Sequence, residues 1–138
     1  MPLIRYPGSK HKLYEGALKP LFPHWVTSRL FAHGAAKGYY EPFFGCGAIG
    51  FNVMKELPTT CEVWVNDKDE DLVCLWRSVK DCKRPLMRLI WQFKPSVDAF
   101  FRFKETDGMN DCDEVQRGFR KLALHRMSVS GFGVKSGG

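Results

Sequence analysis

Three glycines and one aspartate have types and spacing that could bind a cofactor. Gly45, Gly47 and Gly50 lie within residues 39–52 (YYEPFFGCGAIGFN) and form a G-x-G-x-x-G pattern between a predicted strand and a predicted helix. Glycines in that context allow a tight turn and the close approach of a ligand to the backbone. Asp67 follows about 20 residues later, at the end of the next predicted strand, where a carboxylate can accept hydrogen bonds from a ribose diol. The pattern predicts a cofactor that contains a nucleoside.

The same residues also have a purely structural interpretation. The glycines would then only connect the strand tightly to the helix, and Asp67 would cap a helix beginning near Lys68. We favour the cofactor, because the glycine pattern and the acid occur together in the expected order of elements.

The residues around the loop favour S-adenosylmethionine among the nucleoside cofactors. A dinucleotide needs the helix N-terminus for its pyrophosphate, whereas S-adenosylmethionine has no phosphate and presents an amino group and a carboxylate. Glu41 precedes the loop as an acceptor for the amino group, and the segment RYPGSK supplies Tyr6 and Lys10. A nicotinamide-dependent oxidoreductase stays open as a competitor, and it predicts NADH binding and no use of residues 6–10.

The elements that must position these residues alternate between strands and helices. Short runs rich in β-branched and aromatic residues predict strands at 39–43 and 61–65. Apolar residues at helical spacing predict helices from Ser9 to Pro20, from the glycine loop to Leu57, and at 69–82, 85–93 and 114–127. Residues 104–114 are predicted to form a polar loop and the tail 128–138 to be irregular. This alternation predicts an α/β protein.

The composition is that of one soluble globular domain with a basic balance of charge. The 138-residue chain has a formal net charge of +6 and a pI near 9.2, which suits a polyanionic partner. No apolar run is long enough to span a membrane and no signal-peptide core follows the N-terminus, so we expect a cytoplasmic protein. The five cysteines are far apart, without a C-x-x-C pair or a histidine at ligand spacing, so we expect free, mostly buried thiols and no metal site.

Basic residues gather in two stretches of the second half of the chain. In the first, bases outnumber acids and aromatic residues are interleaved: Arg77, Lys80, Lys83, Arg84, Arg88, Trp91, Phe93, Lys94, Phe100, Phe101, Arg102, Phe103 and Lys104. This stretch either contacts nucleic-acid phosphates or forms a solvated basic face over an aromatic core, and the helical spacing of the aromatics is more typical of a core. The second stretch contains Arg120, Lys121, Arg126 and Lys135.

Four blocks of the sequence together resemble the N-terminal part of the Dam-like family of DNA adenine methyltransferases. They are RYPGSK near the start, EPFFGCG with the glycine loop, VNDKDEDLVCLW at the end of the second predicted strand, and HRMSVSGFG near the end. Their order and spacing agree with the family, and the match spans nearly the whole chain. The resemblance implies a Rossmann-like S-adenosylmethionine-dependent methyltransferase fold, incomplete in these residues, with the start of a helical target-recognition region.

The resemblance also implies roles for individual residues. In the family, the first block and the glycine loop help to hold S-adenosylmethionine and the Asp of the third block binds its ribose. By position, these roles fall to Tyr6, Lys10, Glu41, Pro42, Phe43, Gly45, Gly47 and Asp67. Lys68 would border the adenine ring. For contact with double-stranded DNA, the resemblance favours the second basic stretch: Arg120, Lys121, Arg126 and Lys135.

Two departures from the family pattern concern the chemistry. His125 stands where the family often has Asn, so a contact carried over from that Asn-Arg pair rests on Arg126 alone. The catalytic motif of the family is Asp-Pro-Pro-Tyr or a close relative, and these residues contain no Pro-Pro pair. The catalytic residues are therefore unknown, since Ser128, Ser130 and Tyr40 are candidates by side-chain type only and are more typical of structural positions.

The expected organisation is a cofactor-binding part at residues 1–82 and a helical segment at 83–138 that resembles the beginning of the recognition region. The implied activity is site-specific methyl transfer from S-adenosylmethionine to the exocyclic amino group of adenine in DNA. We expect this chain to be the N-terminal part of such an enzyme, completed by a C-terminal half or a second chain, and to be marginally stable alone because later strands would cover its apolar faces. The alternative is a small, catalytically inactive module that binds nucleic acid or a partner protein.

Overall fold

The computed structural model of the 138-residue chain describes residues 3–4, 10, 12, 14–21, 37–106 and 113–135. The chain forms two compact units. One, the sheet unit, is Gly8–Asp67, and the other, the helical unit, combines Met1–Pro7 with Lys68–Gly138. The predicted boundary between residues 82 and 83 falls inside the helical unit, between two of its helices.

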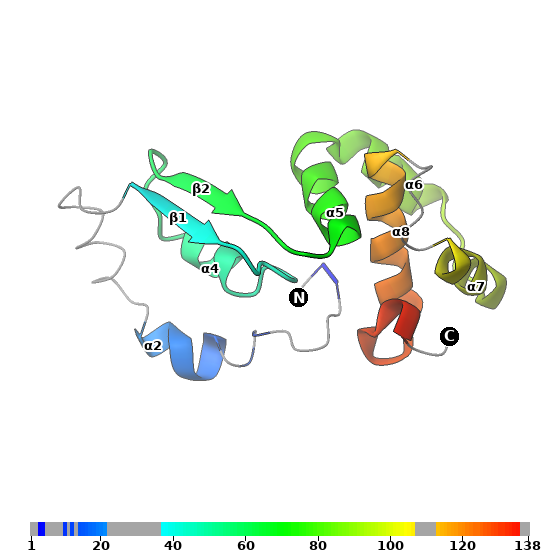
Figure 1. The fold of residues 1–138 in the computed structure, drawn as a ribbon, viewed down its shortest axis with the longest axis horizontal. Helices are drawn as coiled ribbons and strands as arrows, with labels where there is room; N and C mark the ends of the chain where they lie inside the picture. The colour runs from blue at the N-terminus through cyan, green and yellow to red at the C-terminus, as the bar shows by residue number, and fades with distance from the viewer. Residues whose placement is uncertain are drawn as a thin grey trace. The chain divides into compact units, whose positions relative to one another are not determined.

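The sheet unit contains two parallel strands, β1 (Gly38–Glu41) and β2 (Glu62–Val65), with Gly38 opposite Glu62 and Glu41 opposite Val65. Figure 1 shows the strands side by side, with the short helix α4 (Gly50–Met54) between them in the sequence. Parallel neighbours require such a crossover connection, because a tight hairpin can join only antiparallel strands. Both predicted strands are confirmed, and together with the helices they make this a mixed α/β protein.

Two helices of the sheet unit differ from the prediction. The helix α4 ends at Met54 rather than at Leu57, because Glu56 N–H donates to the carbonyl of Val53, three residues back, and tightens the chain into a turn. Near the N-terminus, a π-helical turn, η1 (Tyr14–Leu18), runs into α2 (Lys19–Leu21), so Pro20 lies inside a helix that it was predicted to end. Ser9 lies outside the described residues.

The helical unit contains α5 (Glu70–Asp81), α6 (Lys83–Gln92), α7 (Val97–Glu105) and α8 (Glu114–Met127). Two 3-10 turns, η3 (Val129–Gly131) and η4 (Gly133–Lys135), follow α8. The predicted bounds of the helix at 114–127 are confirmed, and those of α5 and α6 agree to within two residues at each end. None of the helices in the described ranges is long and apolar enough to cross a membrane.

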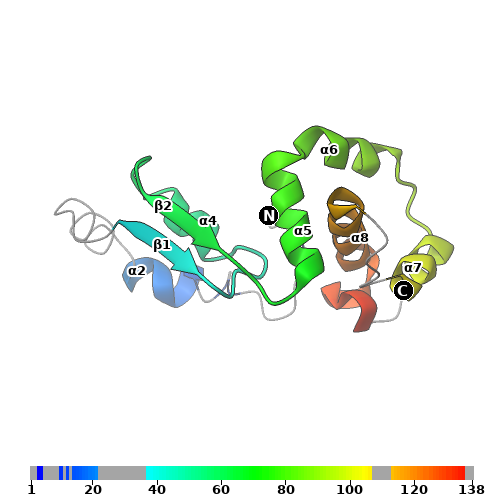
Figure 2. The ribbon, with the colours of Figure 1, turned by 45° about the horizontal axis from the view of Figure 1, so that its top comes forward.

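The packing of α5 against α8 forms the centre of the helical unit. In Figures 1 and 2 the two helices lie side by side. Gly118 permits this close crossing, because a Cβ at that position would lie 2.7 Å from the Cα of Leu75. Leu72 and Leu75 on α5 are fully buried, and Phe119 and Leu122 on α8 are buried with 8% and 7% of their surface exposed, so the apolar faces predicted for both helices are confirmed.

The helix α7 was not predicted. Its N-terminus is capped by Ser96, whose hydroxyl accepts a hydrogen bond from Ala99 N–H at 3.0 Å, and Phe100 is buried. Phe101, next to Phe100, is about half exposed (49%), so the run FFRF has no clear apolar periodicity. For that reason the spacing of apolar residues did not predict this helix.

Candidate functional site

The glycine loop follows β1 and occupies the carboxyl end of the two-stranded sheet. Gly45 and Gly47 have φ values of 52° and 71°, in the left-handed region that side chains with a Cβ rarely adopt. The backbone N–H of Phe44 donates to the carbonyl of Asn66 at 2.8 Å, which ties the loop to the chain just after β2. The loop is therefore held at the carboxyl end of the parallel strands, which is where ligands bind in α/β proteins.

The structure brings Asp67 and the glycine loop together. The backbone N–H of Gly45 donates to the Asp67 carboxylate at 2.8 Å. The cap of α5 is instead Asp69, whose carboxylate accepts a hydrogen bond from Leu72 N–H at 3.1 Å. The structural interpretation that gave the capping role to Asp67 is therefore wrong, and Asp67 contacts the loop with which the spacing had paired it.

The second and third glycines of the pattern have a packing role inside the loop. A Cβ at Gly47 would collide with the Phe51 ring and lie 2.9 Å from Cζ of Phe44. A Cβ at Gly50 would collide with the Glu41 carboxylate. These two glycines are therefore required by their own neighbours, whatever ligand the loop holds.

Glu41 lies under the loop in a partly buried environment. Its carboxylate accepts a hydrogen bond from the Tyr39 hydroxyl at 2.7 Å. Burial raises the pKa of Glu41 above its ordinary value, and the hydrogen bonds from Tyr39 and the Gly50 backbone reduce that rise. Burial and the neighbouring Glu41 also raise the pKa of the Tyr39 hydroxyl.

The other residues predicted to hold the cofactor are spread over both units. Pro42 and Phe43 are exposed beside the loop, with 80% of Phe43 accessible. Lys10 in the sheet unit and Lys68 in the helical unit are also exposed. Tyr6 lies outside the described residues.

The cations predicted to contact DNA divide into two buried and two exposed side chains. Arg120 and Lys121 are only 6% and 8% exposed. Lys121 forms an ion pair with Asp69 at 2.8 Å, which holds it against the N-terminus of α5. Arg126 and Lys135 are exposed at the end of α8 and in η4. The prediction missed this difference because α8 is buried almost all around between Gly118 and His125.

The segment after α8 is more ordered than the prediction of an irregular tail. Nδ1 of His125 makes a 2.7 Å hydrogen bond with the carbonyl of Gly131, and the Ser128 hydroxyl accepts one from Gly133 N–H at 2.9 Å. Gly131 and Gly133 adopt positive φ values of 76° and 60°. Both His125 and Ser128 are buried, so their polar groups fix the course of this loop. The clustering of His, Ser and Gly in HRMSVSGFG was the feature of the sequence that could have indicated this hydrogen-bonded loop.

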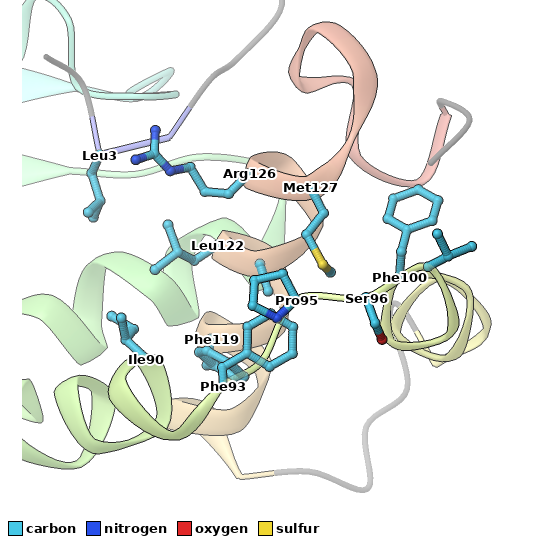
Figure 3. Close-up of a pocket in the computed structure, with 12 residues that line it drawn as sticks. Leu3, Ile90, Phe93, Pro95, Ser96, Phe100, Phe119, Leu122, Arg126 and Met127 are labelled. Carbon is cyan, nitrogen blue, oxygen red and sulfur yellow. The ribbon is translucent and has the colours of Figure 1, made fainter.

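An apolar cavity of about 610 Å³ lies in the helical unit between α6, α7 and α8. Figure 3 shows Phe93, Phe119 and Leu122 along its wall, with Arg126 at its edge. Among the described residues that line it there is no carboxylate, histidine or cysteine, and the hydroxyl of Ser96 is engaged in capping α7.

The described residues offer no metal centre. Within these ranges no group of three or more His, Cys, Asp or Glu side chains is placed to hold a metal ion. The cysteines there are free thiols, and Cys46 is buried, whereas Cys61, Cys74 and Cys82 are partly exposed.

Residues 6–133 match the family of D12 class N6 adenine-specific DNA methyltransferases, and the chain belongs to that family. The family predicted from the four sequence blocks is thereby confirmed. The chain is also 26% identical over 144 aligned residues to the Type II methyltransferase M.MjaIII of Methanocaldococcus jannaschii. This alignment covers 94% of the chain but 46% of the relative, so the chain spans about half the length of that curated protein.

Proposed function

We propose that this chain is the S-adenosylmethionine-binding part of a site-specific DNA adenine methyltransferase and that its sheet unit belongs to a Rossmann-like fold. The observation that carries the proposal is the hydrogen bond between Gly45 N–H and the Asp67 carboxylate. It joins a glycine loop after one parallel strand to an acid after the next, as a nucleoside site in an α/β sheet requires. Family membership and the relative's name support the reaction class.

The geometry of the loop fits a nucleoside. The Asp67 carboxylate accepts from Gly45, and a carboxylate has about four lone-pair positions, so it can also accept from a ribose diol. Gly45 has a left-handed backbone and is partly exposed, so its main-chain atoms are accessible without an intervening side chain, whereas Gly47 is buried. The exposed ring of Phe43 offers an apolar face beside them.

We assign the remaining cofactor contacts by position in the family. Glu41 and the loop amides would hold the methionine end together with Tyr6, Lys10 and Pro42, while Lys68 would border the adenine. When bound, S-adenosylmethionine would supply an electrophilic methyl group on its sulfonium. The chain's own contribution is to bind and orient that group, since no Pro-Pro pair and hence no Asp-Pro-Pro-Tyr motif occurs among its residues.

For double-stranded DNA we propose Arg126 and Lys135 as phosphate contacts. Their exposure suits salt-dependent contacts that do not depend on sequence. The burial of Arg120 and Lys121 suits a supporting role, since Lys121 is already paired with Asp69. In this proposal a C-terminal half of the fold or a second chain would supply the catalytic motif.

The first experiment is a calorimetric titration of the chain with S-adenosylmethionine, repeated on Asp67→Ala and Asp67→Asn. We expect at least a tenfold loss of affinity in Asp67→Ala, equivalent to about 1.4 kcal/mol. Asp98→Asn removes an exposed acid from the first turn of α7 and serves as the matched control, with unchanged affinity expected.

The outcomes separate the competing functions. Unchanged binding in both Asp67 variants would remove Asp67 from the site. Binding of NADH in place of S-adenosylmethionine would favour the oxidoreductase. DNA binding by a folded chain that binds neither cofactor would favour the inactive binding module.

A further inference from the structure

One face of α6 exposes a ridge of two arginines, a methionine and a tryptophan. Arg84, Met87, Arg88 and Trp91 follow one another at intervals of three, one and three residues, so they form one stripe along the helix. All four are exposed, with 42% of Met87 and 81% of Trp91 accessible, while Leu86 points into the core. We call these four residues the α6 ridge. Figure 2 shows α6 along the outside of the helical unit.

The exposure of Trp91 corrects an expectation from the sequence. The aromatics between Arg77 and Lys104 were expected to form core, and Phe93, Phe100 and Phe103 do pack within the unit. Trp91 instead presents most of its ring to solvent. An exposed tryptophan beside two arginines is typical of a binding surface rather than of a solvated face, because aromatic residues and arginine are enriched at interfaces.

The charge of the ridge is unbalanced. The helix α6 carries Lys83, Arg84 and Arg88 and has no acidic residue. In the part of the chain that the structure describes, none of these three cations is in an ion pair, whereas Arg77 and Arg117 of the same unit are paired with Glu114 and Asp71. The flanking lysines Lys80 and Lys94 are exposed too, which extends the positive surface beyond both ends of the helix.

We propose that the α6 ridge is a second DNA-contact surface, distinct from Arg126 and Lys135. Arg84 and Arg88 lie one turn apart, about 6 Å along the helix axis, so both guanidinium groups can reach the same phosphodiester strand. A guanidinium binds a phosphate through two parallel hydrogen bonds. The indole of Trp91 can donate its N–H to a phosphate and lay its ring on a sugar or an exposed base.

A polyanion is the partner that these charges favour over a protein. A protein surface would have to be acidic along the whole ridge to balance the cations, whereas every stretch of DNA meets that condition. The inference rests on the proposed function for the presence of DNA, but not on cofactor binding. It assigns DNA contacts to particular residues of α6, a helix within the segment 83–138 for which the resemblance implied only the start of a recognition region.

The test measures the affinity of the chain for a fluorescein-labelled, mixed-sequence duplex by anisotropy at several salt concentrations. The variant is Arg84→Gln with Arg88→Gln, and the control is Lys12→Gln with Lys55→Gln, which removes the same charge from exposed positions of the sheet unit. We expect at least a tenfold weaker binding for the ridge variant at low salt. The slope of log K against log salt should fall by about 1.8 in magnitude, because two phosphate contacts are lost.

A fluorescence readout reports on Trp91 itself. If duplex binding quenches the tryptophan emission, Trp91→Phe should remove most of that quenching, while Trp64→Phe in the sheet unit should leave it. Unaltered S-adenosylmethionine binding and circular dichroism in the ridge variant would show that it remains folded.

The results distinguish the inference from the proposed function. A ridge variant that binds DNA like the control, while the wild type binds well, would overturn the inference and leave the proposed function standing. If the variant alters only self-association of the chain, the ridge binds protein and the inference is wrong. A wild-type chain that fails to bind duplex at low salt would overturn the inference together with the DNA contacts proposed for Arg126 and Lys135, whereas the cofactor-binding role would still be decided by the S-adenosylmethionine titration.

Discussion

At the scale of single residues, the loop around Gly45 combines a binding geometry with its own internal support. Asp67 contacts the loop from one side through the Gly45 N–H. Glu41 supports it from within, beside Gly50 and the Tyr39 hydroxyl. Both carboxylates accept hydrogen bonds from protein groups, and burial raises the pKa of Glu41 above its ordinary value.

The raised pKa of Glu41 makes the stability of the sheet unit depend on pH. The pKa of Glu41 is raised from its ordinary value of 4.5 in the folded state, so the folded protein binds this proton more tightly than the unfolded chain does. Its unfavourable contribution is present above the folded pKa and disappears as the pH falls to the unfolded value. We expect wild type to gain stability relative to Glu41→Gln between pH 7 and pH 5, measured by urea denaturation at each pH.

The control for this pH dependence is Glu56→Gln, an exposed glutamate in the turn after α4. Its difference from wild type should stay nearly constant over the same range. A Glu41→Gln difference that moved in the opposite direction would show that hydrogen bonding, rather than burial, dominates the titration of Glu41.

At the scale of elements, α5 and α8 are held together by close backbone contact and a buried ion pair. Arg117 on α8 meets Asp71 on α5 at 2.6 Å, and both side chains are mostly buried. The hydrogen bond to Asp71 raises the pKa of the Arg117 guanidinium above its ordinary value. Asp69 caps α5 and also binds Lys121 of α8, which fixes the relative position of the two helices.

Gly118→Ala tests the closeness of this crossing. Alanine is the better helix former by about 1 kcal/mol, but its Cβ would lie 2.7–2.9 Å from the α5 backbone at Leu75 and Cys74. Backbone atoms cannot move aside as a flexible side chain can, so we expect a net loss of about 1–3 kcal/mol in unfolding free energy. Gly16→Ala, where nothing lies within 4 Å of the added Cβ, is the control in a urea titration. Equal stability of both variants would mean that the helices are farther apart than described.

At the scale of the whole molecule, the chain consists of two compact units. The sheet unit leaves Tyr40 and Trp64 about half exposed on its strands, at 59% and 47%. Parallel sheets in α/β proteins are ordinarily covered on both faces. The expectation that the chain is marginally stable alone remains a prediction, and these exposed rings are its structural basis.

Independence of the two units can be tested with a double-mutant cycle. Gly47→Ala should cost about 2–4 kcal/mol, because it places a Cβ at a positive φ and against Phe51 and Phe44 of the sheet unit. Gly118→Ala acts on Leu75 and Cys74 of the helical unit. With no shared partner, the two losses should add to within about 0.5 kcal/mol when measured by denaturation. A coupling above about 1 kcal/mol would show that the units fold as one.

The amino-acid sequence alone was enough to predict the family, the two strands, the helices α5, α6 and α8, and the pairing of the glycine loop with Asp67. Those features depend on local spacing and on short motifs, both of which are visible in the amino-acid sequence. The helix at 114–127 is another such feature, because its cap and its apolar period lie within one segment.

Tertiary packing determines which charged and aromatic residues are accessible to a binding partner. Arg120 and Lys121 are buried because α5 and α6 cover α8, and Trp91 is exposed because its face of α6 has no neighbour among the described elements. Helical spacing says which residues share a face, but not whether another element covers that face. Burial is therefore a property of the packing, and it separates the cations of α8 from the exposed ridge of α6.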